Sequence, residues 1–478
     1  MGERTRSTFK ELLSTGSGKA GVIFISVLFI ISLGVVITYP PDFGLKYWSN
    51  PVLWADNPRA APPAWTNLFT SDDKAETIIL ETSVPSERIP GIGTGIVLYT
   101  FDFNYDSDEA PTFTSMTIEN IRYNNRPPVL TVNIERPDGN KIELFKLIVR
   151  GPLPDEEAPF TRFGETPFRI QFSGDTSVVG SVSNFLKQKF NISMSNQDLL
   201  LSGVDTVVFG IPQDDEKFEV LKGSYKLQVE AFLYDDDDSI GKVKFVLGGS
   251  VFGFMGTDTL GRDLSIGLLF GFPVALFIGL VASSITTVIG TSLGIISGYM
   301  GGKTDTLIQR AADIFTNIPL LPILIFLAFI MRPNLLIIIL ILTVFGWPGL
   351  TILIRSMVLQ IRSGQLVESS ITLGASRLRI MLRHIFPQTA PFVFAQMIFF
   401  TPSAILAEAA LSFLGLGDPS LPTWGQILEY GFRNGGIFVG YWWWILPPGI
   451  LIVITAMTFV LIALGMEPII NPRLKRGN

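Results

Sequence analysis

The sequence predicts an all-α polytopic membrane protein with six transmembrane helices and a β-rich, sandwich-like domain inserted between helices 1 and 2. Hydrophobic residues make up 47% of the 478 positions and charged residues only 16%, a balance typical of integral membrane proteins. Uncharged runs recur along the chain, and about 20 apolar residues in a helix span the hydrocarbon core of a bilayer. Residues 70–250 break this pattern, because their hydrophobic residues alternate with polar ones as in β-strands.

The scarcity of cysteine and histidine limits the chemistry of the chain. No cysteine is present, which excludes disulfides, thiolate metal sites and cysteine nucleophiles. The single histidine, His384, is expected to be structural, so we expect no catalytic residue and no metal site. Charge is distributed unevenly: residues 70–250 hold 29 acidic residues against 17 Lys and Arg, while the remainder holds 13 against 19. Two parts of the chain therefore face different surroundings.

The first predicted span follows a basic, polar N-terminus. Residues 1–19 are predicted to be cytoplasmic, and residues 20–39 carry no charge, so they are long enough to cross the membrane. The run ends in TYPPDF and lacks a small-x-small cleavage site, which favours an uncleaved span over a signal peptide.

Residues 70–250 are predicted to form an extracytoplasmic β-rich domain of at least eight strands, large enough to bury its own core. Alternating hydrophobic residues predict one hairpin over 129–149 and a second from 225–233 through the acidic turn 235–241 to 243–247. The acidic run Asp235–Asp238, with residues 214–216, is interpreted as a solvated turn because its spacing matches no calcium loop. Further strands are expected at 77–82, 94–103, 112–121 and 204–211, and a short helix at 181–190.

The remaining spans form a predicted permease core over residues 256–466, followed by a basic cytoplasmic tail at 467–478. Residues 264–302 carry no charge, and Gly271, Phe272 and Pro273 are expected to divide them into a short interfacial helix and a span. The five expected spans of this core are residues 274–299, 314–331, 333–354, 389–407 and 441–466.

The distribution of basic residues predicts the orientation. With six spans, the short segments on one side carry 14 Lys and Arg, whereas the short connections on the other side carry mainly Arg332 and Arg433. Because basic loops remain in the cytoplasm, this bias places residues 70–250 outside a cell membrane and residues 360–387 inside.

The segment Glu368–Pro387 is a basic, helix-forming stretch between two long apolar runs. Its hydrophobic residues follow a spacing near 3.6, and Gly374 marks a sharp turn or a close approach of another backbone. The segment resembles the coupling loop of ABC importer permeases, with two serines where the family has alanines. The resemblance assigns coupling to Glu368, Ser369, Ser370, Gly374, Ala375, Arg377, Arg383 and Pro387. The alternative is an amphipathic helix resting on the cytoplasmic leaflet.

Three further motifs extend the resemblance: GTDTLGRD at 256–263, AEAALSFLGLG at 407–417 and PTWG at 422–425. Together they resemble the second permease subunit of the dipeptide and oligopeptide class of binding-protein-dependent ABC importers. The family implies a homologous permease, two ATPase subunits that bind ATP and Mg²⁺, and an external solute-binding protein, with no cofactor in this chain and no nucleic acid. In that family a Pro-rich segment runs almost directly into the first motif, so residues 70–250 resemble a large extracellular insertion.

Four charged residues are candidates for a pore or gate: Asp258, Arg262, Asp263 and Glu408. Asp258, Arg262 and Asp263 could equally form an ion-pair network that caps a helix, and Glu408 could be a helix-packing acid, although carboxylates within membranes are often functional. The predicted function is a permease subunit that is not an enzyme and carries peptides or oligosaccharides. The alternatives are a membrane-anchored sensor whose β-domain binds a ligand and a secondary transporter. No residue identifies the solute.

Overall fold

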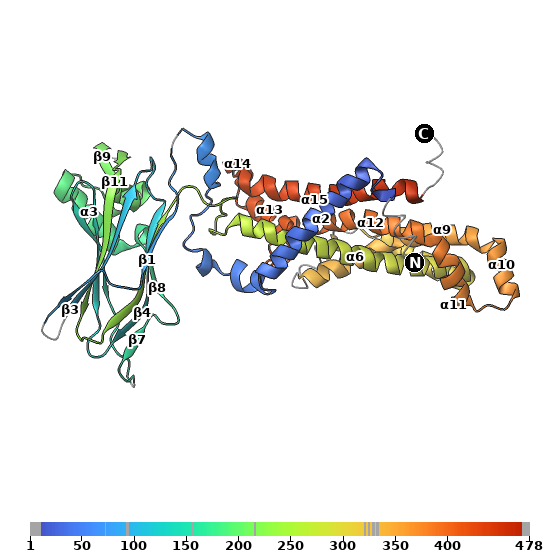
Figure 1. Ribbon diagram of the computed structural model, residues 1–478, viewed down its shortest axis with the longest axis horizontal. Helices are drawn as coiled ribbons and strands as arrows, with labels where there is room; N and C mark the ends of the chain where they lie inside the picture. The colour runs from blue at the N-terminus through green and yellow to red at the C-terminus, as the bar shows by residue number, and fades with distance from the viewer. Residues whose placement is uncertain are drawn as a thin grey trace. The chain divides into compact units, whose positions relative to one another are not determined.

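The structure of the chain is a computed structural model that describes residues 11–470 except 72, 92–94, 155, 215–216, 320–321, 324–325, 327–329 and 331–333 (Figure 1). The chain divides into two compact units. Residues up to Asn50 and from Leu264 onward form a helical unit, and residues 51–263 form a β-rich unit.

Five helical segments of the described residues are long and apolar enough to cross a membrane. Eight of the 18 residues of the expected span over 314–331 lie outside the described residues, so the count of six is not confirmed. The five are Gly16–Thr38, Leu264–Met300, Leu335–Arg362, Arg377–Leu416 and Trp442–Met466. The elements of the helical unit are α2 (Gly16–Thr38), η1 (Gly44–Trp48), α6 (Leu264–Met300), α7 (Gly302–Asn317), α9 (Leu335–Arg362), α10 (Gln365–Thr372), α11 (Arg377–Ile380), η5 (Met381–Ile385), α12 (Phe386–Leu411), η6 (Ser412–Leu416), α13 (Trp424–Arg433), α14 (Gly436–Val439) and α15 (Trp442–Ile470).

The predicted break at Gly271–Pro273 is wrong, because α6 runs unbroken for 37 residues, about 55 Å at the rise of an α-helix. A proline removes only one helical hydrogen bond, and neighbouring groups support the helix here. Trp424 packs closely over Gly271 and donates its indole N–H to the Leu268 carbonyl at 2.9 Å. Packing of α6 against Trp424 of α13 therefore outweighs the helix-breaking tendency of Gly271 and Pro273.

Close packing of α6 against α9 organises the helical unit. Gly290, Gly294 and Gly298 face α9, and a Cβ on Gly294 would lie 2.7 Å from the Cβ of Ile354. Small residues let two membrane helices approach closely, so they gain van der Waals contact along their length. Figure 1 shows α10 and α11 at one end of this unit and α13 and α14 at the other.

The β-rich unit is a sandwich of two antiparallel five-stranded sheets, with a separate pair of strands. One sheet has the order β1-β12-β4-β7 with β8 also on β4, the other has the order β2-β3-β11-β5-β6, and β9 pairs with β10. The strands are β1 (Ile78–Thr82), β2 (Glu87–Pro90), β3 (Gly95–Tyr105), β4 (Phe113–Tyr123), β5 (Val129–Glu135), β6 (Lys141–Ile148), β7 (Phe160–Arg162), β8 (Phe168–Gln171), β9 (Gly210–Asp214), β10 (Lys217–Val220), β11 (Gly223–Leu233) and β12 (Ser239–Gly248). Ring contact between Phe101 and Phe245, at 5.3 Å, joins the two sheets through a shared hydrophobic core.

The first predicted hairpin is confirmed as β5–β6, and the second is wrong. β11 pairs with β3 and β5, whereas β12 pairs with β1 and β4, so the acidic turn crosses from one sheet to the other. The buried Asp238 organises this crossing by accepting backbone N–H groups of Asn124, Tyr234 and Asp235. In both strands, alternate side chains point into the core between the two sheets. The two strands of a hairpin show the same alternation, so the sequence pattern does not distinguish the two arrangements.

The strand expected at 204–211 is also wrong in its first half, where α5 (Val204–Val208) forms before β9 begins. The buried Arg136, which directly follows β5, donates to the carbonyls of Val207, Val208 and Gly210, and so satisfies the end of this short helix from a distant part of the chain. The helix expected at 181–190 is confirmed and longer, as α3 (Thr176–Phe190), and α4 (Asn196–Ser202) follows it.

Candidate functional site

The predicted coupling segment begins with α10 and turns sharply at Gly374. Gly374 has φ of +77°, and its N–H donates to Ile371 O at 2.9 Å, while the N–H of Ala375 donates to Ser370 O at 3.0 Å. This pair of bonds is a Schellman motif, which ends a helix with a left-handed residue. The sharp turn is thus present, and a Cβ at Gly374 would meet none of the described residues within 4 Å.

One face of the coupling segment is buried against the spans. Val367, Ile380 and Ile385 are fully buried in a cluster with Ile295 and Tyr299 of α6, with α9 and with Val393 of α12. From Arg377 the helical path continues through η5 into α12, so Pro387 lies in the first turn of α12, where proline is tolerated. The segment is therefore fixed to the membrane helices.

The coupling segment also carries several large apolar side chains that are exposed. Leu373 is the most exposed, at 86%. The complete group, here called the apolar row, is Leu366, Ile371, Leu373, Leu378 and Leu382. Exposed apolar patches of this kind mark sites of interaction. Their hydrophobic character is visible in the sequence, but only the fold separates them from the buried Ile380 and Ile385.

The polar residues assigned to coupling surround this row. Glu368, Arg377 and Arg383 are exposed. The hydroxyls of Ser369 and Ser370 donate to the carbonyls of Gln365 and Leu366, both at 2.7 Å. Because its hydroxyl bonds to the helix's own backbone, Ser369 presents a small and weakly polar surface, whereas Ser370 is buried and presents none.

An ion pair that the sequence analysis did not predict lies at the same end of the unit. Arg355 of α9 holds Asp305 of α7 through two hydrogen bonds of 2.5 and 2.6 Å, and Ser297 of α6 donates to the same carboxylate. The Arg355 guanidinium lowers the pKa of Asp305 and keeps it charged. Fifty positions separate the partners, so no local sequence signal indicates the contact.

Three of the candidate gate residues form an internal network in the β-rich unit. Asp258 and Arg262 are both buried and joined by a hydrogen bond of 2.5 Å, and Asp258 also accepts the N–H groups of Leu260 and Arg262. Asp263 pairs by its backbone with Thr257. This geometry agrees with the ion-pair alternative.

Glu408 lies at the C-terminal end of α12 and is 3% exposed. Its carboxylate accepts a hydrogen bond from Ser412 at 2.7 Å. Gly417 passes so close to Ser412 and to the buried Gln426 that any side chain at 417 would collide with both. Glu408 therefore belongs to a tightly packed polar cluster that joins α12 to α13.

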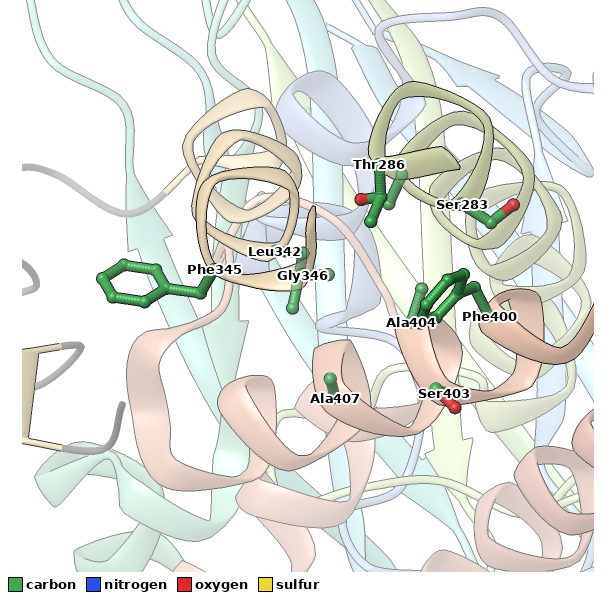
Figure 2. A pocket seen from close by; sticks show the side chains of 10 residues that line it. Ser283, Thr286, Leu342, Phe345, Gly346, Phe400, Ser403, Ala404 and Ala407 are labelled. Carbon is green, nitrogen blue, oxygen red and sulfur yellow. The ribbon is translucent and has the colours of Figure 1, made fainter. Parts of the chain in front are cut away.

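A cavity of about 220 Å³ lies between α6, α9 and α12 (Figure 2). Small and apolar side chains dominate its lining, with hydroxyls from Ser283, Thr286 and Ser403, and none of the described residues that line it is charged. The full lining is Ala282, Ser283, Thr286, Leu342, Phe345, Gly346, Phe400, Ser403, Ala404 and Ala407. None of these residues was singled out from the sequence, because uncharged residues in a span carry no distinguishing signal.

The described residues contain no group of three His, Asp or Glu side chains able to hold a metal ion. In the acidic loop considered for calcium, residues 215–216 lie outside the described residues.

Comparison with known proteins gives consistent matches over the helical unit. Residues 290–476 match the family described as binding-protein-dependent transport system inner membrane component. The chain is similar to the dipeptide transport system permease protein DppC of Bacillus subtilis (strain 168), with 36% identity over 47% of this chain and 69% of that protein. It is also similar to the oligopeptide transport system permease protein OppC of the same organism, with 34% identity over 47% and 72%. The OppC protein of Haemophilus influenzae is 32% identical over 46% and 70%.

Proposed function

The chain belongs to the family of binding-protein-dependent transport permeases, and from that membership we propose that it carries peptides across a cell membrane. It is a non-catalytic permease subunit of an ABC importer, and ATP hydrolysis lies in partner subunits. The peptide substrate follows from the dipeptide and oligopeptide systems of its relatives. Oligosaccharides, which the sequence analysis left open, have no support among these relatives.

The observation that carries the coupling role is the separation of buried and exposed residues in the segment 365–387. Its buried residues are fixed to α6, α9 and α12, whereas the apolar row and Gly374 are exposed. We assign these exposed residues to a cleft on an ATPase subunit. Small residues at Ser369 and Gly374 then allow close approach, and Glu368, Arg377 and Arg383 provide polar contacts around the row.

The proposed topology has six spans with both termini in the cytoplasm, the sixth over residues 314–331. The excess of Lys and Arg near α10 and α11 supports a cytoplasmic location for that end of the unit. The β-rich unit then lies outside the cell membrane. The cavity between α6, α9 and α12 is proposed as part of the peptide path, and its uncharged lining suits a transporter that accepts varied side chains.

The complete assembly is proposed to contain a homologous permease, two ATPase subunits and an external solute-binding protein. The complex reconstituted in liposomes should take up a labelled dipeptide or oligopeptide when ATP is inside. Glu368→Lys should reduce uptake per ATP hydrolysed without unfolding the spans, whereas Ser363→Ala, an exposed change just before the segment, should not. Equal uptake per ATP in both variants and the unaltered complex would refute the coupling assignment.

The β-rich insertion is proposed to help dock the solute-binding protein. Residues 70–250 carry a formal charge of −12, which can steer a partner with a basic face before contacts form. Replacing residues 70–250 with a Gly-Ser linker should weaken binding of the solute-binding protein and reduce the salt dependence of that binding. Unchanged affinity and uptake would instead support a stabilising cap with no partner.

A further inference from the structure

An exposed aromatic patch lies where the β-rich unit connects to the spans. We call residues 51–69 and 250–263 the collar, because the chain enters the unit through one and leaves through the other. Among the strongly exposed apolar side chains of the collar are Leu68 at 81%, Phe69 at 82% and Phe254 at 68%. Together with the partly exposed Trp65 they form what we call the collar patch.

Direct contacts bring the two halves of the collar patch together. Trp65 donates its indole N–H to the carbonyl of Phe254 at 2.8 Å, and its ring meets the ring of Phe69 edge-on at 6.3 Å. Trp65, Leu68 and Phe69 belong to η3 (Ala64–Phe69), a 3₁₀ helix, in which residues three apart lie one above the other. The patch is thus one continuous surface made from segments almost 190 residues apart.

Hydrogen bonds and ion pairs within the β-rich unit hold the polar residues of the collar and leave its apolar residues exposed. On η3, Thr66 bonds to Pro63 O at 2.6 Å and Asn67 bonds to Lys74 O at 3.0 Å, so the polar residues are held by the unit itself. In the collar, Asp56 binds Lys244 of β12 at 2.5 Å and also binds Arg169 of β8. These contacts fix the collar to the sandwich, while the apolar residues remain outward.

Chain continuity indicates what covers the patch. The collar ends at Asp263, and the uncharged helix α6 begins at the next residue. Phe254 precedes Leu264 by only ten residues, so the connecting chain spans at most about 35 Å. Trp and Phe beside leucine are the side chains that settle into the headgroup region of a bilayer.

We propose that the collar patch is a membrane-interface anchor, which inserts Leu68, Phe69 and Phe254 into the lipid headgroup region beside α6. The anchor would hold the β-rich unit at a set height and tilt against the bilayer. This proposal goes beyond the transport function and does not depend on it, because the contact requires only that α6 crosses a membrane.

The absence of cysteine makes a direct test possible. Phe69→Cys and Phe254→Cys are made singly in the full chain, labelled with a nitroxide and placed in nanodiscs of phosphatidylethanolamine and phosphatidylglycerol. Collision rates are measured with oxygen, which enters lipid, and with a nickel chelate, which stays in water. Matched controls are Val84→Cys and Ile148→Cys, at apolar positions of the same unit that are 72% and 70% exposed.

Labels at 69 and 254 should favour oxygen over nickel, and both controls should favour nickel. The double change Leu68→Ser and Trp65→Ser should shift the label at 254 towards the control values, with thermal unfolding showing that the unit remains folded. Labels at 69 and 254 that match the controls would overturn the proposal. Low collision rates with both reagents would also overturn it, because they would indicate that protein covers the patch.

Discussion

Two explanations account for glycine at position 374, and substitutions at that position distinguish between them. The first is backbone strain, since φ of +77° costs an ordinary L-residue about 1 to 2 kcal/mol. The second is space for a partner, since a Cβ at 374 would meet none of the described residues within 4 Å and would extend from the surface of the chain. Asparagine adopts left-handed conformations more readily than alanine and is also larger.

The two reasons predict opposite orders of severity. If strain dominates, Gly374→Ala should be worse than Gly374→Asn, because 1 to 2 kcal/mol shifts the local conformational equilibrium by roughly 5- to 30-fold. If the residue enters an ATPase cleft, Gly374→Asn should be worse, because its longer side chain collides with the partner. The coupling assignment predicts the second order.

The assay measures peptide uptake and ATP hydrolysis by the reconstituted complex. Gly440 provides a matched control, since it has φ of +86°, equally open surroundings and a position at the opposite end of the helical unit. Gly440→Asn should leave uptake per ATP unchanged, while Gly374→Asn lowers it. A larger loss in Gly374→Ala than in Gly374→Asn, or equal losses at 374 and 440, would refute the argument for a docked turn.

Three further predictions concern the rest of the chain. Lys244 and Arg169 outweigh the effect of burial and lower the pKa of Asp56, so its stabilisation is complete above an ordinary pKa near 4 and is lost as pH falls through the folded-state value. Asp56→Asn should cost about 2 kcal/mol at neutral pH, seen as faster amide exchange in β8 and β12, and no difference from the unaltered chain at neutral pH would contradict this. Ser239→Cys should react with an impermeant maleimide on intact cells and Ser376→Cys only after the membrane is opened, so labelling at 376 from outside would refute the topology. Gly294→Ala should lower the melting temperature through a collision costing about 1 to 3 kcal/mol, whereas Gly34→Ala, where nothing lies within 4 Å, should not, and equal effects would refute the packing argument.

The sequence predicts elements well where one interaction dominates their formation. Uncharged runs predict α2, α12 and α15 correctly, because the free energy gained when an apolar segment enters lipid outweighs the local preferences of its residues. The alternation and the turn at 137–140 identify β5 and β6, since both strands of that hairpin belong to one sheet. The left-handed turn at Gly374 is also predictable, because few other residues adopt that conformation cheaply.

The errors occur where distant residues decide the structure. β11 and β12 have the alternation of a hairpin, but Asp238 holds the intervening turn so that the strands join opposite sheets. α5 forms where a strand was expected because Arg136, almost 70 residues earlier, satisfies its terminal carbonyls. The gate candidates Asp258 and Arg262, only four positions apart, are buried and paired with each other, in agreement with the ion-pair alternative of the sequence analysis.

The same three helices connect the coupling segment to the cavity, and this suggests how force would pass between them. Near the coupling segment, Ile295, Ile354 and Val393 are packed in one buried cluster with Val367 and Ile380. Farther along, the same α6, α9 and α12 line the cavity. On α6, Ile295 and Ser283 are twelve residues apart, about 18 Å along a helix.

Packed helices transmit displacement because close-packed interiors resist compression. A shift of the coupling segment would therefore move its buried residues together with the three helices, rather than slide over them. The glycines of α6 that face α9 strengthen this link, since they allow the two helices to move as a pair. Because the cavity has walls from both that pair and α12, a small rotation of the pair against α12 would change its width. Rocking of packed elements is a common route between two states, and here it would open or close a path with uncharged walls.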